Sequence, residues 1–487
     1  MSLIRKLIQH GSTYMFGEVV IMLAGFISFP IFTRILDKEE YGTMSLITIS
    51  LALVETFASA GLRHSSQRFY AEYEHEGQAR AFYSTTVLSS LAFGMAATLG
   101  IVLITRILAW ANLLADKTAT IFSIAAILVV ARVMAKIIGC IYRIKERPGT
   151  YALFAILSKY AAMGLAIYFV MVRLYGLLGY FAGLLAGELL VLLVLLLVMV
   201  KELGPPARPF SSPMLRRMIA YGFPLVVASF AGVLLASGDR YVIGLLRGPA
   251  DVATYSVPYN LCSYIKDVLV TGMEFAFIPL IMNEWSRADR SRTREIVRHV
   301  IRLYCLVALP TVFGVCALGE RFIVALASSK YAGASSILPY VVTGEMLHGL
   351  FAPLMIGLYF YQQTRQLALL TWLAAGANVV LNFALIPAFG LQGAALATLL
   401  SYVLLMVAGM SRAAKFFPVV LPWRYLVAYA ACAALMYGFL AVLSALFPSL
   451  GLLALIAAGI GFYVLAASLA DRDLGKLIRR PSALFSR

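Results

Sequence analysis

Charged residues are scarce in this chain, and no long polar stretch interrupts it. Asp, Glu, Lys and Arg make up 13% of the 487 residues, whereas 62% are hydrophobic. A soluble protein of this length carries about a quarter charged residues. The polar gaps between apolar segments are short, which leaves no room for a soluble catalytic domain. The sequence therefore excludes a soluble enzyme and predicts that the function lies between membrane helices.

Cysteine is also rare, and its placement disfavours a disulfide framework or a metal site. No two cysteines form a C-x-x-C pair, and all five lie in or at the ends of apolar segments. They are Cys140, Cys262, Cys305, Cys316 and Cys432. Their expected role is that of small apolar packing residues. We expect neither a metal nor a cofactor.

What the chain does contain is a series of apolar segments, each long enough to cross a bilayer, which takes about 20 residues. These segments predict an all-α polytopic membrane protein with about 14 transmembrane helices. The fourteen segments are residues 12–34, 42–64, 81–105, 118–141, 152–173, 176–200, 217–238, 252–281, 298–320, 335–358, 367–387, 391–410, 424–447 and 450–470.

Lys and Arg concentrate on one side of this series. Of the 40 basic residues, 27 fall in the two termini and in every second loop, nine fall in the other loops, and four lie inside spans. This asymmetry is the positive-inside pattern, and it predicts a multi-pass protein of the cytoplasmic (inner) membrane with both termini in the cytoplasm. The net charge of +17 then reflects loops beside anionic lipid, and no nucleic-acid partner is expected.

A proline-rich segment over residues 201–216 is the best internal boundary. It holds four prolines after the sixth span, a composition that breaks helices and links bundles. It predicts an N-terminal six-helix bundle over residues 1–200, a cytoplasmic linker over 201–216 and a C-terminal six-helix bundle over 217–412. Two additional helices and a basic cytoplasmic tail follow over 413–487.

Several stretches of the sequence together resemble one family of membrane transporters. They are GFISFPIFTRILDKEEYGTMSL near the N-terminus, GLRHSSQRFYAEY at 61–73, ASGDRYVIGLL and ATYSVPYNL within 236–261, and FGLQGAALATLLSY at 389–402. On these motifs the chain is similar to the polysaccharide-exporter branch of the multidrug/oligosaccharidyl-lipid/polysaccharide flippase superfamily, the Wzx-like O-antigen and exopolysaccharide flippases. The similarity is collinear over residues 12–410.

The resemblance implies two six-helix bundles that form a V-shaped cavity, plus two C-terminal helices. It implies a flippase that moves a lipid-linked oligosaccharide, of the polyprenyl-phosphate type, across the cytoplasmic membrane by alternating access. Such transport serves cell-surface polysaccharide biosynthesis. The expected partners are membrane lipid and the lipid-linked glycan, with other polysaccharide-assembly proteins as further candidates.

Charged side chains inside the spans are the candidates for substrate binding, because a charge at the bilayer centre is costly without a partner or a function. Arg132 and Lys136 lie four residues apart, on one face of the fourth span. Lys159 lies in the fifth span and Glu188 in the sixth. The four residues predict either a cationic pocket for the lipid phosphate, with Glu188 as counter-ion, or a salt-bridge cluster that ties three spans together.

Lys266 and Asp267 are adjacent in the middle of the eighth span. Neighbours on a helix diverge by about 100°, so we expect these side chains to point apart. The resemblance implies that spans one, two, seven and eight line the cavity, which makes Lys266 the first candidate for contacting phosphate. The further candidate substrate contacts are Arg63, Arg240, Tyr259 and Tyr264.

Intramembrane carboxylates are the candidates for coupling transport to a proton or a sodium ion. A carboxylate beside a Lys can take up a cation when an anionic substrate draws the Lys away. The alternative, a plain ion pair with a nearby Lys or Arg, stays open for each of them. The candidates are Asp267, Glu274, Glu55, Glu18 and Glu188.

Two other functions fit parts of the pattern. A multidrug exporter of the same superfamily takes cationic substrates and needs an acidic lumen, whereas here basic residues lie in central spans. A membrane glycosyltransferase or O-antigen polymerase would account for the acidic loop Asp37-Lys38-Glu39-Glu40, but such enzymes typically add a large outer domain or loop. The sequence therefore predicts a flippase and not an enzyme.

Overall fold

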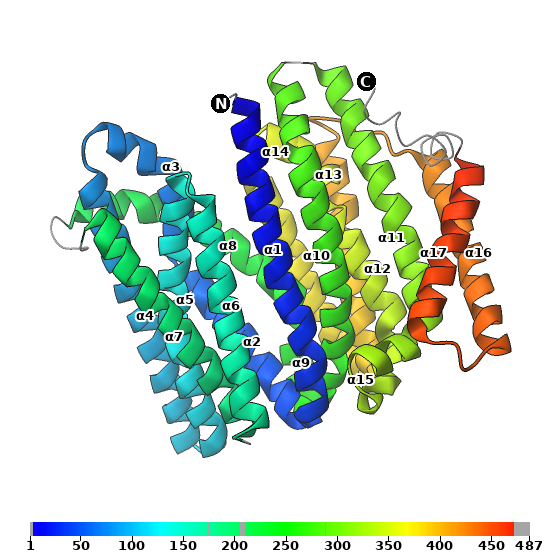
Figure 1. Cartoon of the computed structure of the whole chain (residues 1–487), viewed down its shortest axis with the longest axis horizontal. Coiled ribbons are helices and arrows are strands. Elements are labelled where there is room, and N and C mark those ends of the chain that lie inside the picture. Colours follow the sequence, from blue (N-terminus) through cyan, green and yellow to red (C-terminus); the bar gives the residue numbers. More distant parts are fainter. Residues whose placement is uncertain (1–2, 174, 205–209, 288, 472–487) are drawn as a thin grey trace. The chain divides into compact units, whose positions relative to one another are not determined.

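The chain folds into long helices. The computed structural model describes residues 3–173, 175–204, 210–287 and 289–471 (Figure 1). Eleven of the described helices are long and apolar enough to cross a membrane. The prediction of an all-α, multi-pass membrane protein is confirmed.

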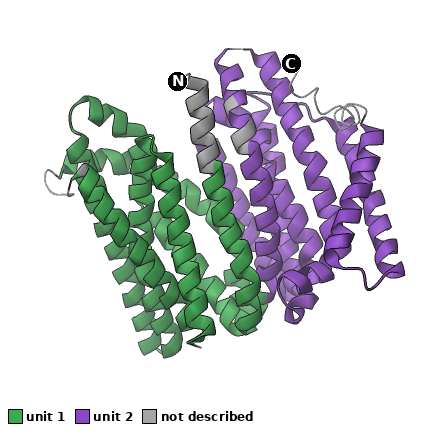
Figure 2. Cartoon of the chain, in the orientation of Figure 1, with its two compact units in different colours: residues 1–253 green, residues 254–487 purple. Residues whose placement is uncertain are grey.

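The helices group into two compact units, residues 1–253 and residues 254–487 (Figure 2). Unit 1 holds α1 (Leu3–Ile35), α2 (Lys38–Ala58), α3 (Leu62–His75), α4 (Ala79–Trp110), α5 (Asp116–Ile144), α6 (Pro148–Met171), α7 (Gly176–Leu203), α8 (Ser212–Ser237) and α9 (Asp239–Arg247). Helix α10 (Pro249–Ser286) begins in unit 1 and continues into unit 2. Unit 2 then holds α11 (Arg290–Leu326), the 3-10 helix η1 (Ser329–Ile337), α12 (Leu338–Gly349), α13 (Phe351–Leu354), α14 (Ile356–Phe360), α15 (Thr364–Ala413), α16 (Trp423–Leu446) and α17 (Leu452–Ala470).

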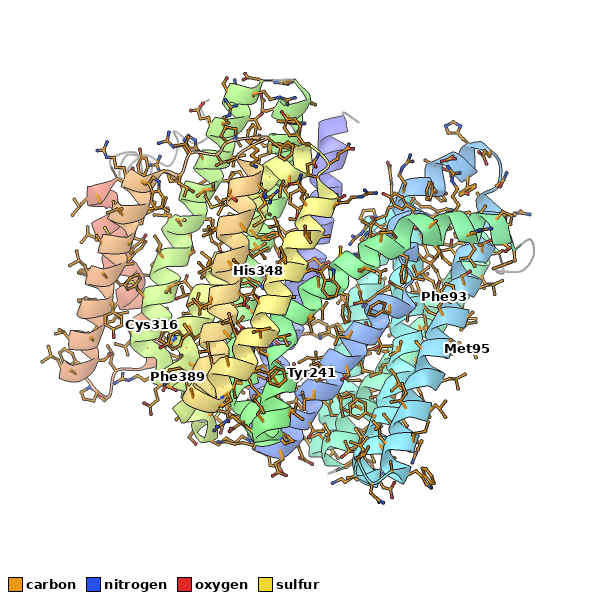
Figure 3. All side chains as sticks on the ribbon, turned by 180° about the vertical axis from the view of Figure 1, so that it is seen from behind. Phe93, Met95, Tyr241, Cys316, His348 and Phe389 are labelled. Atoms are coloured by element: carbon orange, nitrogen blue, oxygen red, sulfur yellow. The ribbon has the colours of Figure 1, made fainter. Side chains whose placement is uncertain are left out.

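Helices α8 and α9 pack with unit 1, whereas the boundary read from the sequence placed them in a second bundle. Ser65 of α3 donates a hydrogen bond from its hydroxyl to the Met218 carbonyl of α8 at 2.5 Å. The hydroxyls of Ser50 in α2 and Tyr241 in α9 (Figure 3) lie 2.7 Å apart. The linker sequence marks where helix breaks, but these contacts attach the helices that follow it to the first unit.

Three predicted spans take other forms than single straight helices. Helix α15 covers both the eleventh and the twelfth predicted span and turns at Gly390, whose φ of 58° favours glycine. The tenth predicted span, residues 335–358, is divided between η1, α12, α13 and α14. Pro353 lies in this span and has no amide hydrogen to donate to a helix. Separately, the Met346 carbonyl of α12 accepts a hydrogen bond from the Tyr304 hydroxyl at 2.8 Å.

The turn between α2 and α3 positions the edge of the candidate site. Ala60 and Gly61 both have positive φ, 44° and 73°, so the chain bends sharply at this point. A Cβ atom on Gly61 would lie 2.1 Å from the carbonyl carbon of Gly222 in α8, so only glycine allows this close approach. The turn holds α3, which starts at Leu62, against α8.

The core of unit 1 fixes one face of α5. Met134, Ile137 and Ile141 of α5 are buried in an apolar cluster with side chains of α3, α4, α7 and α8. Burial of this face at about 25 cal/mol per Å² anchors the helix. The opposite face of α5 carries its charged residues.

Candidate anion-binding cavity

Unit 1 contains a cavity of about 710 Å³ between α1, α2, α3, α5, α6 and α7. Basic side chains outnumber acidic ones on its wall, five to three, which gives a formal lining charge of 5 − 3 = +2. The basic residues are Arg63, Arg132, Lys136, Arg143 and Lys159, and the acidic residues are Glu18, Glu55 and Glu188.

Helix α5 supplies three of the five cations from a single face. Arg132, Lys136 and Arg143 follow one another at intervals of four and seven residues, which places them on one side of the helix. Gly139 and Cys140 lie between them on the cavity wall. Arg143 is not among the residues predicted from the sequence, although its spacing of seven from Lys136 could have identified it.

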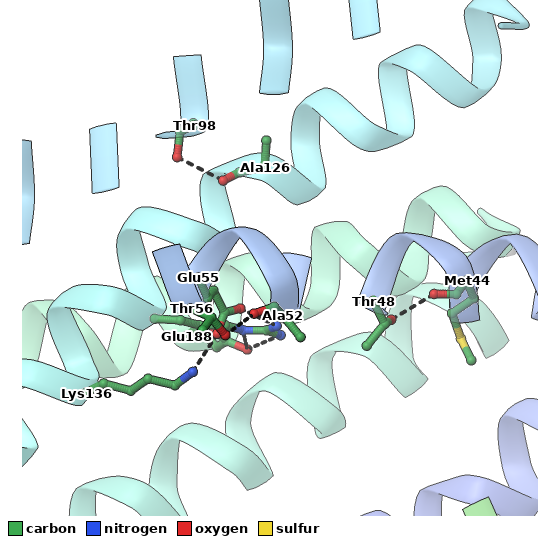
Figure 4. A network of polar contacts seen from close by, with 10 residues as sticks. Met44, Thr48, Ala52, Glu55, Thr56, Thr98, Ala126, Lys136 and Glu188 are labelled. Carbon is green, nitrogen blue, oxygen red and sulfur yellow. Dashed lines mark hydrogen bonds and ion pairs between the residues drawn. The ribbon is translucent and has the colours of Figure 1, made fainter. Parts of the chain in front are cut away.

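Arg132 is held by carboxylates from two other helices. Its Nε and Nη2 atoms donate to the two oxygens of Glu188 at 2.9 and 2.8 Å, which is a bidentate pair. Its Nη1 donates to Glu55 Oε1 at 3.2 Å, and Lys136 Nζ lies 2.6 Å from Glu55 Oε2 (Figure 4). Helices α2, α5 and α7 are therefore joined by a continuous ion-pair network.

The network leaves cations of the cavity without a carboxylate. Within the part of the chain that the structure describes, neither Lys159 nor Arg63 forms an ion pair. Arg143 lies over the ring of Tyr151, with 4.5 Å between the guanidinium carbon and the ring centroid.

The predicted salt-bridge cluster is found for Arg132, Lys136 and Glu188, but Lys159 of α6 forms none of its ion pairs. Glu55 of α2 takes part instead, so the cluster joins α2, α5 and α7 and not the fourth, fifth and sixth predicted spans.

Lys266 lies in unit 2 and is not one of the residues that line the cavity of unit 1. Its Nζ is 2.8 Å from Glu345 Oε2 in α12 and 3.4 Å from Asp267 Oδ1. The expectation that Lys266 and Asp267 point apart is wrong, because the long lysine stem lets its ammonium group reach back to the neighbouring carboxylate. One turn after Glu345, His348 stacks on Tyr402 with ring centroids 4.9 Å apart (His348 in Figure 3).

Arg240 also lies outside the cavity wall, at the junction of α8 and α9. Its side chain is buried, donates to the Ala236 carbonyl at 2.8 Å, and pairs with Asp239 at 3.0 Å. These contacts tie the start of α9 to the last turn of α8.

The remaining predicted residues lie on α10. Tyr259 is buried against Tyr255, with ring centroids 4.9 Å apart, and Tyr264 is half-buried. Glu274 lies in the same helix, and its side chain is outside the described part of the structure. The aromatic residues that do line the cavity include Tyr151 and Tyr180, which the sequence analysis did not select.

Comparison with solved structures identifies the fold. "Lipid II flippase MurJ, inward closed conformation" matches with a TM-score of 0.70 at 14% identity, covering 95% of this chain and 99% of that chain. An outward-facing multidrug resistance transporter of the MATE family, of the MOP superfamily, matches with a TM-score of 0.61 at 14% identity, covering 84% and 95%. The fold is that of the MOP superfamily.

The sequence places the chain more narrowly. Residues 7–285, more than half of the chain, match the family described as "Polysaccharide biosynthesis protein", and the chain belongs to this family. It is also similar to the probable low-salt glycan biosynthesis flippase Agl15 of Haloferax volcanii, at 22% identity over 187 residues. That alignment covers 38% of this chain and 39% of Agl15, so the chain spans about two-fifths of this curated relative.

Proposed function

We propose that this protein is a flippase that moves a lipid-linked oligosaccharide, of the polyprenyl-phosphate type, across the cytoplasmic membrane by alternating access. The observation that carries the proposal is the cavity of unit 1, whose wall holds five cations against three carboxylates. A phosphate headgroup is the anion that complements this surplus in a membrane setting. Membership of the polysaccharide biosynthesis family and the similarity to Agl15 support a glycan as the cargo.

Basic residues of the cavity wall are the groups that would receive the phosphate. Lys159 is available because no described carboxylate pairs with it, and Lys136 keeps 60% of its side chain exposed while it contacts Glu55. Arg63 lies at the start of α3, just after the end of α2. The positive-inside pattern assigns this end of α2 to the cytoplasm. The headgroup would therefore enter from the side on which cytoplasmic enzymes assemble lipid-linked sugars.

The MATE-like fold alone would also suit export of cationic drugs. A lining charge of +2 repels such cargo and attracts an anion. Glu18, which forms no ion pair with any described residue, is the carboxylate best placed for a coupling proton or sodium ion. An enzymatic role is not proposed, because the relatives reported above are named as flippases and transporters.

Reconstitution tests the proposed function. Purified protein in liposomes is expected to move a lipid-linked oligosaccharide with a labelled sugar from one leaflet to the other, and cells without the protein should accumulate that intermediate. The matched assay loads the same liposomes with a cationic dye. Dye export without movement of the lipid-linked sugar would overturn the proposal in favour of a multidrug exporter.

Sidedness can be tested separately. Reporter fusions after residues 80, 147, 290 and 415 are expected to read cytoplasmic, and fusions after 116, 248 and 330 external. An external signal at 290, in the arginine-rich segment, would invert the orientation of the cavity and contradict headgroup entry from the cytoplasm.

A further inference from the structure

The three carboxylates of the cavity occupy three different electrostatic situations. Glu188 holds Arg132 alone, through two parallel hydrogen bonds. Glu18 pairs with no described residue. Glu55 bridges two cations, with one oxygen 3.2 Å from Arg132 Nη1 and the other 2.6 Å from Lys136 Nζ. Only Glu55 therefore binds between two cations in the way that oxygens of a phosphate group bind.

Glu55 is also the most deeply buried member of the network. Its side chain is 5% exposed, against 24% for Arg132 and 60% for Lys136. It reaches this place from α2, whereas both cations belong to α5. The carboxylate of α2 therefore lies between two basic side chains of α5, and Figure 4 shows its contact with Lys136.

We propose that Glu55 is a resident anion, which fills the phosphate position between Arg132 and Lys136 in the empty cavity and is displaced when the substrate headgroup binds. This inference rests on the proposed function and adds the route by which the site exchanges one anion for another. A diphosphate carries more negative charge than one carboxylate, so it competes effectively for the same two cations.

The geometry assigns different roles to the groups around Glu55. Glu188 is a positioning residue, since its bidentate contact keeps the Arg132 guanidinium in place whichever anion occupies the third side. Displacement of Glu55 breaks the ion pairs of α2 with α5. Binding of the headgroup would thereby loosen α2, and return of Glu55 would help to expel the headgroup after transport.

Isosteric substitutions of the three carboxylates form a matched set, because each removes one negative charge from the same cavity. The assay is binding of farnesyl diphosphate, and separately of inorganic pyrophosphate, to the full-length protein in detergent. Glu55→Gln is expected to tighten binding of both probes on the order of tenfold, since the resident competitor loses its charge. Glu18→Gln should tighten binding by a clearly smaller factor, because Glu18 forms no ion pair with Arg132 or Lys136. Glu188→Gln should not tighten binding because Arg132 loses its support.

Equal tightening by Glu55→Gln and Glu18→Gln would show a general charge effect and overturn the inference, as would unchanged or weaker binding in Glu55→Gln. If that variant does not fold, Glu55→Asp takes its place. Its shorter side chain withdraws the carboxylate from both cations, so binding should tighten by a smaller factor, and no tightening overturns the inference. Equal affinity for both probes in the wild type would overturn a lipid headgroup as the ligand.

The inference and the proposed function fail in different ways. If Glu55 is only a structural tie, wild-type protein still moves lipid-linked oligosaccharide while Glu55→Gln gains no affinity. If the proposed function is wrong, the wild type moves no such substrate, whatever the three variants do to binding of the diphosphate. Amide hydrogen exchange adds an independent readout, because farnesyl diphosphate should increase exchange in α2 of the wild type, and an unchanged rate contradicts displacement.

Discussion

The two units treat their intramembrane charges in opposite ways. In unit 1, five cations share one cavity wall with three carboxylates, and Lys159 and Arg63 have no carboxylate partner among the described residues. In unit 2, Lys266 is flanked by two carboxylates, Glu345 at 2.8 Å and Asp267 at 3.4 Å. The first arrangement leaves positive charge over, whereas the second has more acid than base.

This contrast shows that a charge inside a membrane span does not by itself indicate a binding site. An ion pair offsets part of the cost of burying a charge, so a lysine held by carboxylates needs no anionic ligand. An unmatched cation keeps that cost until an anion arrives. The surplus of cations over carboxylates is therefore the property that separates the two regions.

Substitution of Arg132 should have the largest effect on stability and transport, because Arg132 pairs with two of the three carboxylates of the cavity. Arg132→Gln leaves Glu188 and Glu55 without their shared partner, which costs about 3–5 kcal/mol for a broken buried pair. Transport should be lost, and thermal unfolding in detergent should shift downward. The double variant Arg132→Gln with Glu188→Gln should recover much of the stability and none of the transport, and normal stability in the single variant would contradict the ion-pair network.

Lys159 should separate function from stability. Lys159→Gln removes a half-buried cation that has no described carboxylate partner, so stability should hold or rise while transport falls by at least about tenfold. The control is Lys117→Gln, at an exposed position in the first turn of α5, which should change neither quantity. Wild-type transport by Lys159→Gln would remove this residue from the phosphate site.

Substitution of Lys266 should lower stability and leave transport per folded molecule unchanged, the opposite of the result expected for Lys159. Lys266→Gln leaves Glu345 buried and unpaired, so stability should fall, and export should fall only with the amount of folded protein. A double-mutant cycle with Glu345→Gln is expected to give a coupling energy of about 0.5–3 kcal/mol. If Lys266→Ala is fully folded but abolishes export, and Lys266→Arg keeps part of it, Lys266 contacts the phosphate as the sequence predicted.

The smallest effect is expected at an ion pair on the protein surface. Arg147 and Glu202 lie 2.5 Å apart, with 51% and 33% of their side chains exposed. Glu202→Gln should change the free energy of unfolding by less than about 1 kcal/mol, and less still at high salt. The transport rate of Glu202→Gln should match that of the wild type. A large loss of transport in this variant would show that the surplus of cations in the cavity does not decide which charges transport requires.

The sequence by itself determined that the protein is an all-α, multi-pass membrane protein, and its motifs pointed to the polysaccharide biosynthesis family to which it belongs. Length and apolar composition suffice for the fold class, because a bilayer forces every backbone group to be satisfied within a helix. The family came from the resemblance of the motifs, which composition does not supply. The sequence also identified most charges of the cavity, since any ionisable residue within an apolar span is conspicuous.

Only the tertiary structure decided which of those charges are paired. Arg132 and Glu188 are 56 residues apart, and Lys136 and Glu55 are 81 apart, so no spacing rule connects them. Lys266 and Asp267, which are adjacent, form a contact that helical geometry alone argues against. Pairing depends on side-chain reach across packed helices. The chain sequence therefore fixes which residues carry charge, and the packing of α2, α5 and α7 decides which cations remain free for a ligand.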